Sequence, residues 1–244
     1  MAQSYSNASI SNTGYQLIDL NPGDGIAAGI SFFSTSNAAS ASVLAGTSSD
    51  GYSSSAARTA SSLRAISVAV GDTSSGAAAS YSGGPFGALA ANGQVDGLGT
   101  YSGNQSISTG FTLTPNTVLV VFGQLSGTAI AGSYYNQYTG SSASVSLTGN
   151  ITSDGRGYQS SSIGDNAYSY YYLPNQFSHS FAISFVNGNA TELSGVYNVA
   201  TSVSGANYAF APSPVPEPET CTMMLAGLTV LGALARRRAR NRLQ

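Results

Sequence analysis

The stretch Ser180-Phe-Ala-Ile-Ser-Phe185 decides the fold, because apolar residues alternate along it with small or polar ones. In an extended strand, Phe181, Ile183 and Phe185 point to one side and the residues between them to the other. The same period of two recurs from Val196 to Val203. Both stretches therefore predict β-strands with one buried face.

Further strand patterns occur along the chain, separated by clusters of Gly, Pro, Asn and Asp that favour turns. They cover Tyr15–Leu20, Ile26–Phe33, Ala65–Val70, Ile107–Leu113, Val118–Phe122 and Ala143–Leu147. The run Val118–Phe122 is apolar throughout, which predicts a strand buried on both faces. Alanine-rich Ser53–Ala65 predicts a short helix or a loop, and the Ser/Gly-rich stretches 72–84 and 154–166 predict exposed loops. Together these patterns predict an all-β protein with an antiparallel, jelly-roll-like β-sandwich body over residues 1–210.

The composition excludes several classes of protein. Charged residues make up 7% of the chain, against about 25% in average soluble proteins, and lysine is absent. The body therefore lacks the cations that a nucleic-acid binder needs to neutralise phosphates. The single cysteine excludes a disulfide framework and a thiolate metal cluster.

Charge is distributed unevenly between the two ends of the chain. Up to Ala211 there are three arginines and eight acidic residues, whereas from Pro212 onward there are five arginines and two acidic residues. Such asymmetry is expected of a chain whose two ends meet different surroundings.

The C-terminal tail contains three consecutive segments of different composition. Residues 211–220 carry proline at alternate positions, which predicts an extended linker. Residues 221–235 carry no charge, and we expect them to form a short transmembrane helix of roughly 22 Å. The arginines of residues 236–244 then form a basic cytoplasmic tail, with Arg236, Arg237 and Arg238 as the topology signal. The alternative is a C-terminal core helix with a basic cap.

Three tail segments, in this order, resemble the PEP-CTERM sorting signal of Gram-negative bacteria: Val215-Pro-Glu-Pro-Glu-Thr220, Leu225-Ala-Gly-Leu228 and Arg236-Arg-Arg238. Pro216, Glu217 and Pro218 match the eponymous motif residue by residue. The resemblance implies that an exported precursor is delivered to a membrane-embedded exosortase, which cleaves near this motif. Cys221 departs from the family, where many members carry an aromatic or small residue at that position.

The body resembles other PEP-CTERM proteins more weakly, in phrases such as Leu17-Ile-Asp-Leu-Asn-Pro-Gly-Asp-Gly-Ile26 and Phe111-Thr-Leu-Thr-Pro-Asn-Thr117. This resemblance implies a β-rich exported domain and carries no known active site. The residues Met1 to Ser6 lack the basic and apolar regions of an export signal. Because a protein with this tail must leave the cytoplasm, we expect the given chain to be a mature form from which a signal peptide has been removed.

Three groups of residues are candidates for chemistry in the body. His179, the one histidine, would have to serve any Ser-His-Asp triad, but no Gly-x-Ser-x-Gly elbow accompanies it. Asp19, Asn21 and Asp24 offer oxygen ligands for calcium, but their spacing differs from that of an EF-hand, and a Pro-Gly turn is the simpler interpretation. A secreted hydrolase would need a carboxylate pair such as Asp154 and Asp165.

Tyrosines gather in two parts of the body and could form a stacking surface for sugars. They are Tyr134, Tyr135, Tyr138, Tyr168, Tyr170, Tyr171 and Tyr172. Tyrosine also fills ordinary strand positions, so two interpretations stay open.

The sequence predicts a non-enzymatic, exported cell-surface or extracellular-matrix protein without cofactor or metal. Its expected partners are an exosortase, the membrane and extracellular polysaccharide, and no nucleic acid. The alternatives are a polysaccharide-binding module with a tyrosine-rich surface and a secreted hydrolase.

Overall fold

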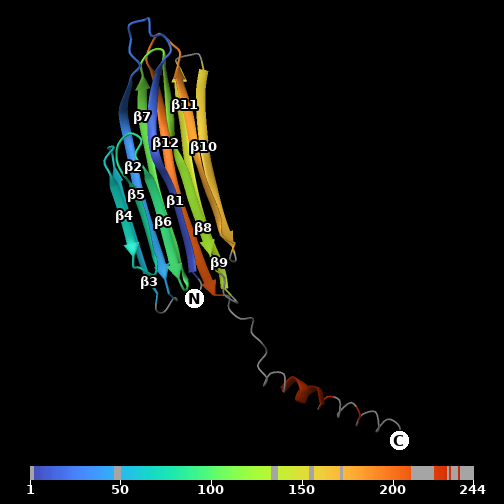
Figure 1. Ribbon diagram of the computed structural model, residues 1–244. Coiled ribbons are helices and arrows are strands. Elements are labelled where there is room, and N and C mark those ends of the chain that lie inside the picture. The colour runs from blue at the N-terminus through green and yellow to red at the C-terminus, as the bar shows by residue number, and fades with distance from the viewer. Residues whose placement is uncertain are drawn as a thin grey trace. The chain divides into compact units, whose positions relative to one another are not determined.

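A computed structural model describes residues 3–46, 51–132, 137–153, 157–170, 173–209, 223–229, 231 and 236. The chain divides into two compact units, Met1–Ala209 and Phe210–Gln244. We call the first unit the body and the second the tail. Over the described residues of the body, twelve β-strands form two antiparallel sheets, so the predicted all-β sandwich is confirmed (Figure 1). Its finer description as jelly-roll-like stays a prediction.

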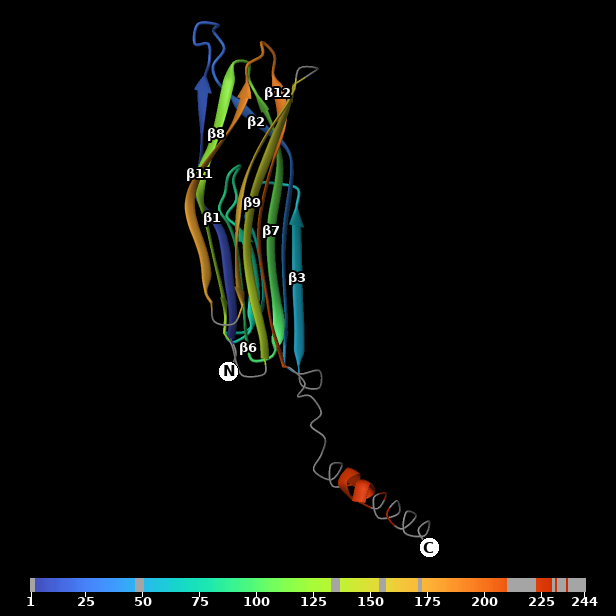
Figure 2. The same ribbon diagram turned by 90° about the vertical axis from the view of Figure 1, so that its right-hand side faces the viewer.

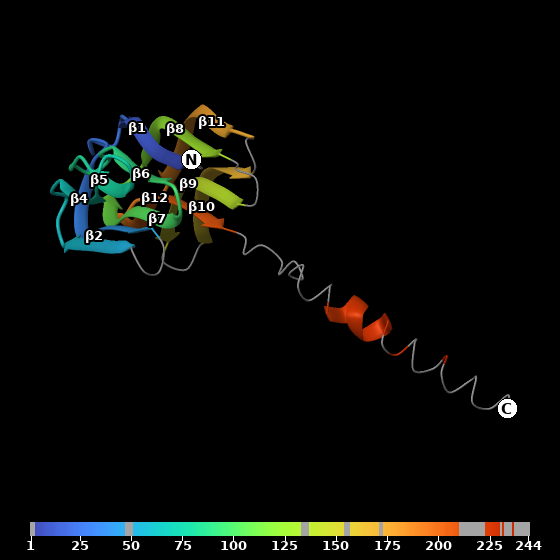
Figure 3. The same ribbon diagram turned by 90° about the horizontal axis from the view of Figure 1, so that it is seen from below.

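Each sheet contains six strands. Sheet A has the order β11 (Asn175–Asn187), β8 (Thr117–Ala131), β1 (Gln3–Asp19), β6 (Leu89–Asp96), β5 (Gly76–Tyr81), β4 (Ile66–Gly71). Sheet B has the order β10 (Gly157–Tyr170), β9 (Gln137–Ser153), β12 (Leu193–Ala209), β7 (Gly99–Leu113), β2 (Ile30–Ala45), β3 (Tyr52–Ala60). Seen along the strands, the two sheets form two layers (Figure 3).

Strand alternation builds the core between the sheets. In β11, Phe181, Ile183 and Phe185 are buried while the residues between them are exposed, as predicted. The predicted alternation of β12 is confirmed as well, because Tyr197 and Val203 are buried on the same side. The inward-facing residues of these strands, most of them apolar, therefore pack into one shared core.

Aromatic rings cover glycines that lie opposite them on neighbouring strands. At each of these glycines, an added Cβ would stand only 2.4 to 2.8 Å from a ring carbon. The pairs are Gly14–Phe122, Gly110–Phe33, Gly123–Phe181, Gly127–Phe177, Gly195–Phe111 and Gly205–Tyr101. The rings thus shield backbone that glycine leaves open, which stabilises strands that would otherwise be weak.

Three predictions about strands and loops are wrong. Ser53–Ala65 contains neither a helix nor only a loop, because β3 pairs with β2 from Tyr52 to Ala60, and this long-range pairing overrides alanine's weak local preference. The stretch 72–84 contains β5, and the described part of 154–166 lies in β10. The serines and glycines within 76–81 and 157–166 occupy strand positions, whereas residues 72–75 and 82–84 lie outside the strands.

The apolar run in β8 is buried on one face only, contrary to prediction. Leu119 and Val121 are fully buried, whereas Phe122 is 41% exposed. Sheet A has the core on one side only, so alternate residues of β8 face outward although they are apolar.

Residues 223–229 form a short helix whose apolar side chains are exposed. Within the part of the chain that the structure describes, no helix has the length and apolar character needed to cross a membrane. Residues 221, 222, 230 and 232–235 lie outside that part. The transmembrane helix over residues 221–235 therefore stays a prediction.

Candidate functional site

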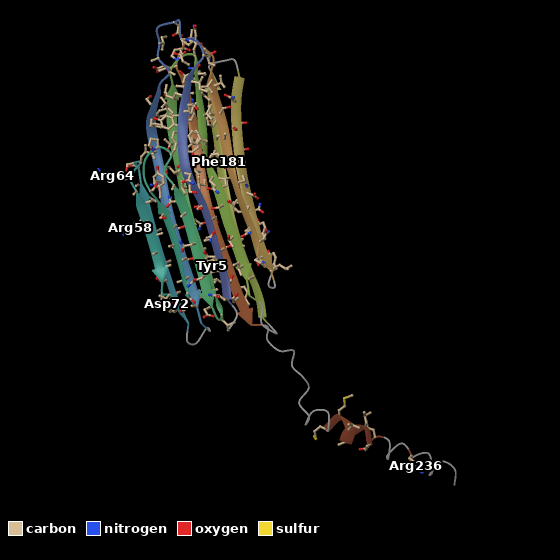
Figure 4. The ribbon with its side chains drawn as sticks, in the orientation of Figure 1. Tyr5, Arg58, Arg64, Asp72, Phe181 and Arg236 are labelled. Atoms are coloured by element: carbon tan, nitrogen blue, oxygen red, sulfur yellow. The ribbon has the colours of Figure 1, made fainter. Side chains whose placement is uncertain are left out.

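The sorting motif predicted in the tail lies outside the described residues. This holds for Pro216, Glu217 and Pro218, and also for Arg237 and Arg238. Arg236 is described and exposed (Figure 4). The role of the sorting motif is therefore inferred from its sequence.

His179 and Asp165 come together at one open edge of the sandwich. His179 lies on β11 and Asp165 on β10, the edge strands of the two sheets, and Nδ1 lies 3.6 Å from Oδ2. Each side chain is 39% exposed. The neighbouring residues Ser178 and Ser180 are exposed on the opposite face of β11. The arrangement therefore brings a histidine and a carboxylate together between the sheets, and neither adjacent serine can act as their nucleophile. Asp154, the other member of the suggested carboxylate pair, lies outside the described residues.

The candidate calcium ligands form a hydrogen-bonded turn. Asp19 Oδ1 accepts a bond from the Asn21 N–H, and Asp24 Oδ1 accepts one from the Ile26 N–H, both at 2.8 Å. Asn116 Nδ2 donates to Asp24 Oδ2, also at 2.8 Å. The Ile26 N–H, followed by the Asn116 amide, lowers the pKa of Asp24. Among the residues with described placement, no three His, Cys, Asp or Glu side chains gather as metal ligands would.

Part of the predicted tyrosine surface lies on the outer face of sheet B. Tyr168 and Tyr170 on β10 are 52% and 48% exposed. The structure adds Tyr208 on β12, which is 54% exposed and which the sequence analysis missed. The alternation of β12 could have revealed it, since Tyr208 has the opposite parity to buried Tyr197 and Val203. Four further tyrosines, Tyr134, Tyr135, Tyr171 and Tyr172, are outside the described residues, as is the side chain of Tyr138.

These three tyrosines border a shallow depression of about 470 Å³ that crosses β2, β7, β12, β9 and β10. Four serines also line it, and they form one cross-strand row: Ser42, Ser102, Ser204 and Ser142, on β2, β7, β12 and β9. The row ends at Tyr168, which is the register partner of Ser142 on β10. We call these four serines and the three tyrosines the tyrosine–serine site. In Figure 2, the antiparallel strands β9, β7 and β3 of sheet B extend along the length of the body.

The serine hydroxyls of the row bind one another in pairs. Ser42 Oγ lies 2.9 Å from Ser102 Oγ, and Ser142 Oγ lies 2.8 Å from Ser204 Oγ. A hydroxyl carries one donor and two acceptor positions, so each pair retains capacity for a further partner. The row is therefore an ordered line of hydroxyl groups along the shallow depression.

The outer face of sheet B carries no charged side chain over its described positions. Its six strands contain only Arg58 and Asp165 as acidic or basic residues. Arg58 pairs in register with buried Ala39 and so lies on the inner side, and Asp165 faces His179 of sheet A. Figure 4 shows Arg58, together with Arg64 and Asp72, along one edge of the body.

Comparison with known proteins identifies a sequence motif in the tail. Residues 214–239 match the family described as the PEP-CTERM protein-sorting motif. No curated protein matches the chain. A structure titled as TmCBM61 in complex with beta-1,4-galactotriose is similar over 45% of this chain and 70% of that chain, with 10% identity and a TM-score of 0.16. That likeness is too low to carry an argument. The tail of this protein therefore carries a PEP-CTERM protein-sorting motif, as its Pro-Glu-Pro sequence and arginine cluster predicted.

Proposed function

We propose that this chain is an exported cell-surface or extracellular-matrix protein that an exosortase processes near Pro216-Glu-Pro218. In this proposal the body is a structural component associated with exopolysaccharide and performs no catalysis. The match of residues 214–239 to the sorting motif is the observation that carries it.

The chemistry of the tail supports recognition by a processing enzyme. Pro216 and Pro218 restrict the backbone to an extended shape, which lowers the entropy cost of binding it. Glu217 places one charge between them, which a basic pocket can bind by charge-assisted hydrogen bonds. The apolar segment that follows delivers this motif to the membrane surface.

The chemistry of the body supports a structural role. The carboxylates of Asp19 and Asp24 are engaged in turns, and Asp72 likewise accepts bonds from the N–H groups of Ser74 and Ser75. The outer face of sheet B presents hydroxyl groups without charge. Such a surface suits contact with a hydrated, hydroxyl-rich matrix better than acid–base catalysis.

The test replaces Pro216, Glu217 and Pro218 together by alanine and follows the chain in its own host. Insertion should survive because the apolar run and the arginines are unchanged, but cleavage should fall and the full-length chain should accumulate in the membrane fraction. Mass spectrometry and cell fractionation measure both.

The matched control is Pro212→Ala with Ser213→Ala, which alters the same linker outside the motif and should leave cleavage unchanged. If the triple-alanine chain is cut as fast as the parent chain, the motif is a plain linker and the proposal is wrong.

A further inference from the structure

We propose that the tyrosine–serine site binds an uncharged polysaccharide, with the sugar chain lying across the strands of sheet B. This inference deepens the proposed function and rests on it, because it names the ligand class and the surface through which the body meets the matrix.

The tyrosine rings supply the apolar part of the site. Tyr168 and Tyr170 rise from β10 on one side of the depression, and Tyr208 rises from β12. About half of each side chain is exposed. Between them the sheet carries small residues, because Tyr170 pairs with Gly140, which in turn pairs with Ala206. Rings that stand above a floor of small residues can stack against the C–H faces of sugars.

The serine row supplies the polar part of the site. Neighbouring strands are roughly 4.8 Å apart, so the five strands from β2 to β10 span about 19 Å. This length suits several linked sugar rings. Along it the paired hydroxyls of Ser42 with Ser102 and of Ser142 with Ser204 can exchange hydrogen bonds with sugar hydroxyls.

The absence of charge selects the kind of polysaccharide. An anionic chain would lose its hydration on the described outer face of sheet B without meeting a compensating cation, since Arg58 lies on the inner side. The same argument disfavours a nucleic acid. A protein partner would have to supply a hydrogen-bond partner for each serine hydroxyl that it buries. A sugar chain carries hydroxyl groups along its whole length and can form these bonds one by one. Charge and hydrogen-bond complementarity therefore favour a neutral polysaccharide.

Sheet A offers matched controls. Ser9 Oγ and Ser126 Oγ form a cross-strand hydroxyl pair at 2.8 Å on its outer face, as the serines of the site do. Tyr15 is 44% exposed on β1 and packs against Phe86. Neither belongs to the depression on sheet B.

The experiment measures migration of the purified full chain, in non-ionic detergent, through native gels that contain a polysaccharide. The neutral probes are dextran, mixed-linkage β-glucan and galactomannan, and alginate is the anionic probe. At least one neutral probe should retard the chain, and alginate should not. Tyr168→Ala and Tyr208→Ala should each weaken binding by roughly three- to tenfold.

The remaining variants separate binding from folding. Tyr168→Phe should retain binding because the ring remains, and Ser102→Ala with Ser204→Ala should weaken it. Tyr15→Ala and Ser126→Ala should bind like the parent chain, and thermal unfolding should confirm that each variant is folded.

Three results would overturn the inference: no retardation by any neutral probe, equal loss in the sheet A controls, or tyrosine-dependent dimerisation in light scattering without polysaccharide binding. If export and cleavage remain normal in any of these cases, the proposed function stands and only the site is wrong.

Discussion

The body and the tail of this chain carry their information in different ways. In the body, the tyrosine–serine site consists of residues far apart in sequence, such as Ser42 and Tyr208, which folding brings to one surface. In the tail, the motif Pro216-Glu-Pro218 is contiguous and precedes an apolar run and an arginine cluster. The body therefore depends on packing, whereas the tail depends on the order of short segments. This difference predicts opposite responses to the same kinds of substitution.

The largest effect should come from emptying the core of the body. Phe111 is fully buried, with its ring centroid 5.6 Å from that of Phe185, so Phe111→Ala should lower the free energy of unfolding by about 3–5 kcal/mol. Phe122→Ala, on the outer face, should cost about 1 kcal/mol or less. Urea unfolding of the full chain measures both. Equal losses would show that the two faces of the sheets are not distinct.

A single added methyl group should also destabilise the body. At Gly149 on β9, a Cβ would stand 2.2 Å from a ring carbon of Phe185 in the opposite sheet. Gly149→Ala should therefore cost about 1–3 kcal/mol, because a packed ring has to move. Gly188→Ala meets open space and is the control. A stable Gly149→Ala chain in thermal unfolding would mean that the core has room that the structure does not show.

High pH should weaken the body gradually. Burial raises the pKa of Tyr81 to about 12 and raises that of Tyr197 further, whereas an unfolded tyrosine ionises near pH 10. The folded state thus favours the neutral phenols, and stability should be constant below about pH 10 and fall as the pH rises toward 12. Urea midpoints between pH 8 and pH 11 test this. Tyr197→Phe should flatten the decline, and a midpoint that stays constant to pH 11 would contradict it.

The arginine cluster should have a partial effect confined to the tail. Replacing Arg236, Arg237 and Arg238 by serine should reduce membrane retention of the uncleaved chain, because basic residues hold the adjacent segment on the cytoplasmic side. Arg58→Ser with Arg64→Ser in the body is the matched control and should retain normal topology. Fractionation and protease accessibility measure the result. Unchanged retention would remove the topology role from the cluster.

The smallest effect is expected in the apolar segment of the tail, where only hydrophobicity is required and any large apolar side chain should serve. Leu225→Phe with Leu228→Phe keeps the tail segment apolar and should leave cleavage unchanged. The same substitution at fully buried Leu119 in the body should cost about 1–3 kcal/mol from overpacking. Pulse labelling of cleavage and urea unfolding test the pair. A marked loss of cleavage would show that the side-chain shapes at Leu225 and Leu228 matter for processing, as side-chain shape matters for packing in the body.

The sequence predicted the strands whose alternation is strict and missed those whose residues are small. Phe181 and Ile183 identify the buried face of β11 because large apolar residues alternate with small ones. In β3, the alanines and serines carry no such contrast, and only pairing with β2 makes the segment a strand. The apolar run that contains Phe122 predicts a strand buried on both faces, because hydrophobicity alone cannot show that one face meets solvent.

The candidate site shows the same division. The motif at Pro216-Glu-Pro218 is local, so the sequence alone revealed it. The pairing of His179 with Asp165 and the row from Ser42 to Tyr168 depend on which strands are neighbours in the sandwich. No local pattern contains that register, although the parity of Tyr208 was readable from its own strand.

β12 joins the two regions, and its place in sheet B determines how the body bears force. It is the last strand before the tail, and it is hydrogen-bonded to β7 from Leu193 to Asn207 and to β9 from Ser194 to Ala209. A pull on the tail against a load at the far end of the body runs along this strand. Both ladders are then loaded in shear, so their bonds must break together instead of opening one after another. A pull transmitted through the end of β12 is therefore resisted by two hydrogen-bonded ladders at once.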